Sequence, residues 1–96
     1  MTQAPEAYEL AGEVDASTAP FHLRRLQDVI AATRSDTVVV ELAATRMVDT
    51  TGLGMLINAH TTASGAGKRL VLRGANHRIV RLMEIAGTHD LFDWEP

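Results

Sequence analysis

A carboxylate and two hydroxyls stand together at the point where a predicted strand gives way to a predicted helix. Asp49, Thr50 and Thr51 follow the apolar run 37–42 and lead directly into a helical pattern. The first backbone N–H groups of a helix have no partner within it, and its N-terminus carries a partial positive charge. Such a position is suited to hold or receive a phosphate, so phosphate chemistry is the function to look for here.

The Thr50 hydroxyl has two interpretations. One is structural, because Thr50, Thr51 or Asp49 can each serve as the N-cap of the helix. The other is a phosphorylation switch, in which a phosphate on Thr50 adds about 1.5–2 negative charges beside Asp49. The helix N-terminus tolerates that charge, but a partner docked over this surface is repelled by it. We therefore predict Thr50 as a phosphorylation site that controls a protein–protein contact without unfolding the domain.

Nucleotide-binding motifs are incomplete in this region. Gly52-Leu53-Gly54 has the first two glycines of the dinucleotide fingerprint, but Ile57 stands where the third would be. A P-loop is excluded because no Gly-Lys-Ser or Gly-Lys-Thr follows. The glycines are better explained by a close approach of the helix start to the sheet, which leaves backbone N–H groups bare.

Enzyme chemistry has little other support. Asp49 as a phosphoacceptor would need neighbouring carboxylates, which Glu13 and Asp15 could supply, and a lysine on a late strand, where Arg73 stands instead. The four histidines do not have the spacing of metal ligands, and the chain contains no cysteine. A Gly-x-Ser-x-Gly elbow is also absent. We expect no enzyme activity, no cofactor and no metal ion.

Composition narrows the class of partner. The 96 residues suffice for a single domain, 1–96, and a net charge of −3 leaves no basic stripe for nucleic acid. The lack of cysteine favours an intracellular protein, and we expect it to be cytoplasmic. No apolar run approaches the roughly 20 residues that span a bilayer, so direct membrane insertion is not expected. Residues 1–6 are predicted to form a disordered tail.

The apolar spacing alternates along the chain between the period of a strand and that of a helix. Such alternation predicts an α/β domain with mainly parallel strands around 37–42, which is apolar on both faces except at Glu41. Sites in such sheets lie at the carboxyl ends of strands, where the 49–51 turn is expected. The predicted strands are 8–11, 37–42 and 69–73, the predicted helices are 19–33, about 51–64 and 77–86, and 91–94 is a short edge element.

Four segments resemble the STAS domain, and in particular the bacterial anti-sigma factor antagonists. They are Gly12-Glu13-Val14-Asp15, Asp49-Thr50-Thr51-Gly52-Leu53-Gly54, Arg81-Leu82-Met83-Glu84-Ile85-Ala86-Gly87 and Leu91-Phe92. The resemblance covers residues 8–94. It implies a single small STAS-like α/β domain, with an open, mostly parallel or mixed sheet of about four or five strands packed against about three or four helices.

The resemblance also implies partner switching. In that family the unphosphorylated antagonist binds an anti-sigma factor, which is also a serine kinase with the ATPase fold of the histidine kinases. The kinase then phosphorylates the hydroxyl after the aspartate, which matches Thr50, and a phosphatase resets the cycle. Leu53 and Met55 are expected to supply apolar contacts next to the acidic loop. The implied partner-binding residues are Glu13, Asp15, Asp49, Thr50, Thr51, Gly52, Leu53 and Met55.

Thr50 leaves a second function open, because the antagonists usually carry serine at this position. Threonine occurs there in stress-signalling relatives and in the small STAS subunit of a bacterial phospholipid-transport ABC system. That subunit docks on the transporter ATPase at the inner membrane. A third alternative is a sensor of a phosphate or nucleotide ligand. In the first two cases the surface around Thr50 is the expected interface.

Overall fold

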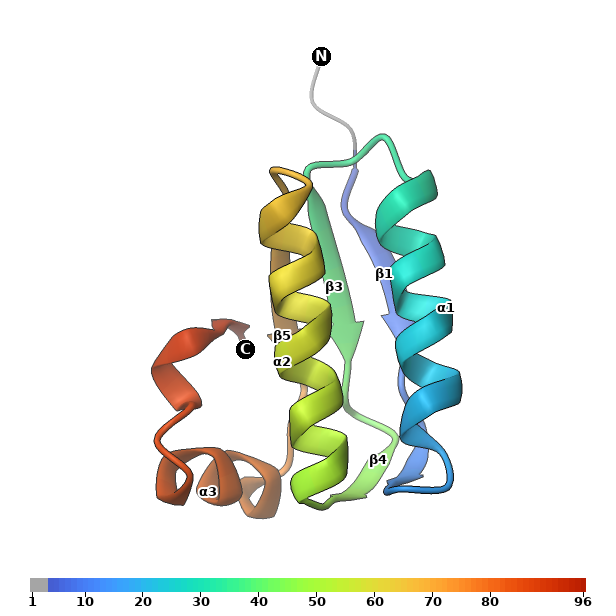
Figure 1. Ribbon diagram of the computed structural model, residues 1–96. Coiled ribbons are helices and arrows are strands. Elements are labelled where there is room, and N and C mark those ends of the chain that lie inside the picture. Colours follow the sequence, from blue (N-terminus) through green and yellow to red (C-terminus); the bar gives the residue numbers. More distant parts are fainter. Residues whose placement is uncertain (1–3) are drawn as a thin grey trace.

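The computed structural model describes residues 4–96, which form an α/β structure (Figure 1). A four-stranded parallel sheet has the order β1-β3-β5-β6, and a two-stranded parallel sheet pairs β2 with β4. Helices α1 and α2 lie side by side over one face of the larger sheet. The elements are β1 (Glu6–Glu9), β2 (Gly12–Val14), α1 (Ala19–Ala32), β3 (Thr37–Glu41), β4 (Thr45–Val48), α2 (Thr50–Gly65), β5 (Arg69–Arg73), α3 (His77–Ile85), the 3₁₀ turn η1 (His89–Leu91) and β6 (Asp93–Glu95).

The core lies between the large sheet and the two long helices. Val38 and Val40 alternate along β3 toward the helices, and neither is accessible to solvent. Leu26 and Ile30 of α1 and Leu56 of α2 meet them from the other side. Each such side chain contributes about 1.5–3 kcal/mol on burial, so this layer is the main stabilising term of a small domain.

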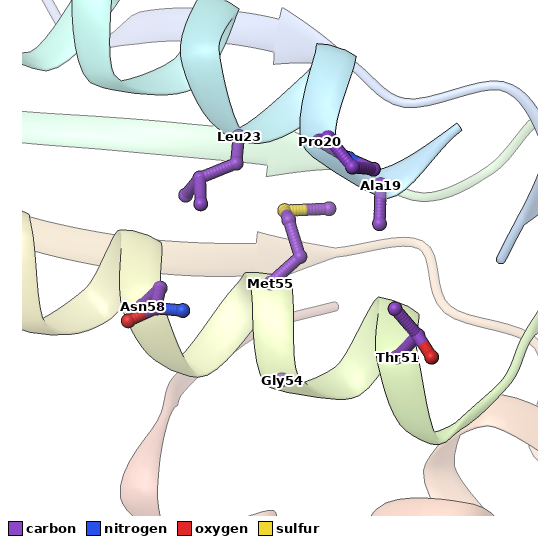
Figure 2. Close-up of a pocket in the computed structure, with 7 residues that line it drawn as sticks. All are labelled: Ala19, Pro20, Leu23, Thr51, Gly54, Met55 and Asn58. Atoms are coloured by element: carbon purple, nitrogen blue, oxygen red, sulfur yellow. The ribbon is translucent and has the colours of Figure 1, made fainter. Parts of the chain in front are cut away.

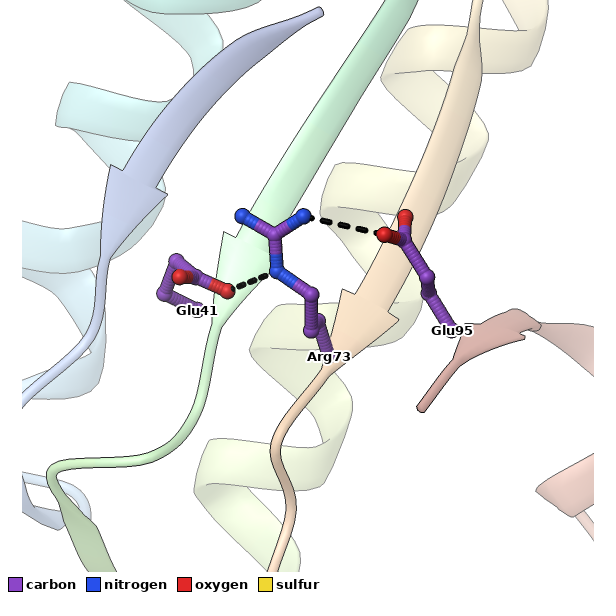
Figure 3. A network of polar contacts seen from close by, with 3 residues as sticks. All are labelled: Glu41, Arg73 and Glu95. Carbon is purple, nitrogen blue, oxygen red and sulfur yellow. Dashed lines mark hydrogen bonds and ion pairs between the residues drawn. The ribbon is translucent and has the colours of Figure 1, made fainter.

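The other face of the large sheet is covered by charged side chains rather than by a helix. Figure 3 shows Arg73 at the end of β5 between Glu41 of β3 and Glu95 of β6. Its Nη1 lies 3.0 Å from Glu95 Oε1. The hydrogen bond from Arg73 lowers the pKa of Glu41. Arg73 therefore helps to hold the edge strand β6, and this late-strand cation is already paired with carboxylates.

The predicted α/β class and the parallel sheet around β3 are confirmed, but several boundaries need correction. The sequence places Glu6 in a tail, whereas it begins β1; residues 1–3 lie outside the described part. Gly12–Val14 and Thr45–Val48 lie outside all the predicted elements, yet they are the strands β2 and β4. The predicted edge element 91–94 spans the end of η1 and the start of β6.

Candidate functional site

The small sheet brings two distant segments of the chain to one edge. Its strands run parallel, with Glu13 paired with Met47 and Val14 with Val48. The backbone N–H of Asp49 then donates to the carbonyl of Val14 over 3.2 Å. The loop after β2 and the start of α2 are therefore neighbours, at the carboxyl ends of the two strands.

Asp49 takes the capping role and leaves the threonines free. Its Oδ1 accepts a hydrogen bond from the backbone N–H of Gly52 over 2.9 Å, as an N-cap carboxylate should. Thr50 is the first residue of α2, and its side chain is exposed. Within residues 4–96, no hydrogen bond occupies the hydroxyl of Thr50 or Thr51. An unoccupied hydroxyl thus stands at a helix N-terminus, where a phosphate is tolerated.

Gly52 allows α2 to begin this close to the small sheet. A Cβ atom at this position would overlap the carbonyl oxygen of Val14 and would lie 2.9 Å from Val48 Cγ1. The residue is buried. The close approach predicted for these glycines is therefore found at Gly52, and it fixes the distance between the helix start and β2.

The acidic loop next to Thr50 has one engaged and one unengaged carboxylate. Asp15 Oδ1 accepts hydrogen bonds from the backbone and the hydroxyl of Ser17, at 2.9 and 2.7 Å, and from the backbone of Thr18 at 3.3 Å. Asp15 therefore organises the turn that enters α1. Glu13 is exposed, and its carboxylate forms no ion pair or hydrogen bond within residues 4–96. Glu13 is thus free to meet a partner, while Asp15 also has a structural task.

Acid should weaken the fold through Asp15. Its hydrogen bonds from Ser17 lower the pKa of the Asp15 carboxyl below the ordinary 3.8. A lowered folded-state pKa gives stabilisation that is complete above that ordinary value and is lost as the pH falls through the folded-state value. Asp15→Asn keeps the acceptor oxygen but does not titrate. We expect the stability difference between wild type and this variant, from urea unfolding, to shrink between about pH 6 and about pH 3. A constant difference would contradict this role.

Leu53 and Met55 do not form an exposed apolar patch. They are only 5% and 3% exposed and belong to the core. The exposed apolar side chain at this edge is Met47, at 40%, which lies in register with Glu13 across the small sheet. The sequence analysis does not identify Met47 as a site residue, because it does not predict β4 as a strand. The alternation of exposed Met47 with buried Val48 is the pattern that could have indicated both.

Three of the histidines contact aromatic side chains of the fold. The Tyr8 hydroxyl lies 2.7 Å from His22 Nδ1, His60 packs edge-on against Phe92, and His89 stacks on Trp94.

Among residues 4–96, no group of three or more potential ligand side chains could hold a metal ion. In the same range, no helix combines the length and the apolar character that crossing a membrane requires.

Comparison with known proteins defines the class. A family model described as "Mlab, STAS domain" matches residues 1–93, and the chain belongs to the STAS domain family. Within that family it is similar to the anti-sigma-B factor antagonist of Listeria monocytogenes, with 32% identity over 84 residues that cover 88% of this chain and 73% of the relative.

Solved structures confirm the STAS fold. An anti-sigma factor antagonist from Mycobacterium paratuberculosis superposes with a TM-score of 0.75 at 25% identity, covering 96% of this chain and 77% of that one. The STAS domain of a SulP transporter from Vibrio cholerae gives a TM-score of 0.76 at 20% identity, with coverages of 100% and 76%. Since regulators and transporter domains share this fold, it does not choose between them, and the named sequence relatives favour the antagonists.

Proposed function

We propose that this chain is an anti-sigma factor antagonist that works by phosphorylation-controlled partner switching. Unphosphorylated, it binds an anti-sigma factor that is also a kinase with the ATPase fold of the histidine kinases. Phosphorylation of Thr50 ends the binding, and a phosphatase restores it. The chain acts as a cytoplasmic binding protein rather than as an enzyme, with neither nucleic acid nor a membrane as its direct partner.

The observation that carries the proposal is the free Thr50 hydroxyl beside the acidic loop. Asp49 already caps α2, so a phosphate on Thr50 need not break a hydrogen bond of the fold. The added charge would join those of Asp49, Glu13 and Asp15 on one edge. Helix α2 tolerates it through its dipole, whereas a partner surface matched to the unmodified edge does not.

The surface for this partner differs in part from the eight residues that the sequence suggests. Glu13, Asp49, Thr50 and Thr51 remain as direct contacts, joined by Met47. Asp15 and Gly52 shape the edge, while Leu53 and Met55 support it from the core. An interface of ordinary size covers about 800 Å² per partner, enough to include this edge and its surroundings.

The experiment that tests the function is capture from a lysate of the native host. Tagged wild type and tagged Thr50→Glu are used in parallel, and bound proteins are identified by mass spectrometry. We expect wild type, but not the variant, to retain an ATPase of the histidine-kinase superfamily. Recovery of an ABC-transporter ATPase instead would favour the transporter subunit and overturn the antagonist assignment.

Glu13→Gln should slow association with the captured ATPase. The change removes one unengaged charge at the rim of the interface and keeps the side chain's size, and rim charges act mainly on the association rate. We expect a lower rate that depends less on salt, measured by stopped-flow or surface binding. Glu84→Gln, which changes an exposed carboxylate on α3, is the matched control. An unchanged rate for Glu13→Gln would place that side chain outside the interface.

A further inference from the structure

An apolar groove opens between the first turns of α1 and α2, next to the Thr50 edge. Its volume is about 360 Å³. Figure 2 shows Leu23 and Ala19 of α1 pointing toward α2, and Met55 of α2 pointing toward α1. The lining residues are Ala19, Pro20, Leu23, Thr51, Gly54, Met55 and Asn58.

The groove is continuous with the proposed interface. Thr51, which lines it, directly follows Thr50, and the backbone N–H of Ala19 donates to the Asp15 carbonyl over 2.8 Å. Farther along the same pair of helices, Gln27 donates a hydrogen bond to Thr62 over 3.4 Å and so bridges them. The hollow thus lies on the N-terminal side of this bridge, from Thr51 to Asn58 along α2. A partner that covers Thr50 with an interface of ordinary size also covers this groove.

Gly52 and Gly54, which both lie near the N-terminus of α2, occur there for different reasons. Gly52 is required by the fold, because a Cβ there would overlap Val14. At Gly54 a Cβ would meet nothing within 4 Å, and Gly54 lines the groove. Glycine inside a helix costs about 0.5–1 kcal/mol relative to alanine, and no contact of the fold requires it at 54. A larger side chain at 54 would instead fill the hollow, so the glycine keeps the groove open.

We propose that this groove receives one apolar side chain of the anti-sigma partner, from a segment that also carries a basic residue. The inference rests on the proposed function. A pocket for a small molecule usually buries most of its ligand, whereas this groove is open to solvent, which suits a side chain presented by a protein. Asp15 accepts a hydrogen bond from the backbone N–H of the lining residue Ala19. Asp49 caps α2 two residues before the lining residue Thr51. Two carboxylates thus belong to residues next to the groove lining, and a positive charge beside the apolar anchor matches them. In this proposal the groove holds the partner's anchoring side chain, and phosphorylation of Thr50 ends the binding.

Gly54→Leu is the variant that tests the groove. A Cβ atom at this position meets nothing within 4 Å, and leucine favours a helix more than glycine does, so the fold should be kept or stabilised. We expect affinity for the ATPase recovered in the capture experiment, purified and measured by calorimetry, to fall at least about 30-fold, as for loss of a central anchor. Ser64→Leu adds the same side chain at an exposed position about 15 Å along the same helix and should bind as wild type.

Each outcome has a defined meaning. Wild-type affinity for Gly54→Leu, with Thr50→Glu unable to bind, would overturn the groove and leave the switch intact. If the wild type binds no such ATPase, the groove and the proposed function fall together. Should Gly54→Leu melt below wild type, Asn58→Trp fills the groove from an exposed lining position and takes its place. Wild-type affinity for that variant would equally overturn the inference.

Discussion

Thr50→Glu is expected to lower affinity for the anti-sigma partner at least about 100-fold while leaving the fold intact. A like charge set against a matched surface costs several kcal/mol, and every 1.4 kcal/mol is a factor of ten in Kd. The same charge lies in the first turn of α2, where it stabilises by about 0.3–1 kcal/mol. Calorimetry of the variant should therefore show the loss of affinity, and a thermal melt of the same sample should give a melting temperature equal to or slightly above that of wild type.

Two further substitutions of Thr50 separate charge from shape. Thr50→Ser keeps the hydroxyl, and Thr50→Val keeps the branched shape without it. Since no hydrogen bond within residues 4–96 uses this hydroxyl, both variants should bind the partner about as well as wild type. Equal loss of binding in Thr50→Val and Thr50→Glu would show that the hydroxyl itself is a contact, and the charge switch would then be wrong.

Gly52→Ala is expected to have the largest effect on stability. The new methyl group would overlap a backbone carbonyl, that of Val14, which cannot move aside as a side chain can. Overpacking usually costs about 1–3 kcal/mol, and a rigid neighbour places this case near the upper limit. For a domain of this size, about 3 kcal/mol lowers the melting temperature by roughly 12 °C or more. Denaturant unfolding and a thermal melt measure both quantities.

Gly54→Ala is the matched control for that substitution. It makes the same chemical change two residues along the same helix, at a position where a Cβ meets nothing within 4 Å. We expect it to stabilise the protein by about 0.5–1 kcal/mol. Similar losses of stability in the two variants would contradict the role assigned to Gly52. The loss would then follow from replacing any glycine near the N-terminus of α2, rather than from the overlap with Val14.

The sequence predicts the part of the site that depends on local chemistry. Asp49 is an N-cap residue by type and position, and the middle of β3 is a run of three valines, so the strand-to-helix order follows from short-range patterns. The small sheet of β2 and β4 cannot be predicted from such short-range patterns. Its strands Gly12–Val14 and Thr45–Val48 are three and four residues long and pair across a large sequence separation. Their hydrogen bonds to each other, rather than any periodicity, define them.

The orientation of side chains on α2 is also hidden from the sequence. The helix packs against α1, β5 and β4, so apolar residues occur around most of it. Hydrophobic periodicity identifies the buried side of a helix that packs against one partner. It cannot tell whether Leu53 or Met55 faces outward on a helix that is covered on more than one side. The same packing explains the groove, because the space beside Gly54 exists only where α1 and α2 meet.

The most direct test of partner switching is phosphosite mapping after incubation of this protein with the captured anti-sigma ATPase and ATP. Peptide mass spectrometry identifies the modified residue, and gel filtration of the product shows whether it still co-elutes with the ATPase. Our account predicts a single phosphate on Thr50 and loss of co-elution. Absence of transfer, transfer to another residue, or a Thr50-phosphorylated protein that remains bound would contradict it.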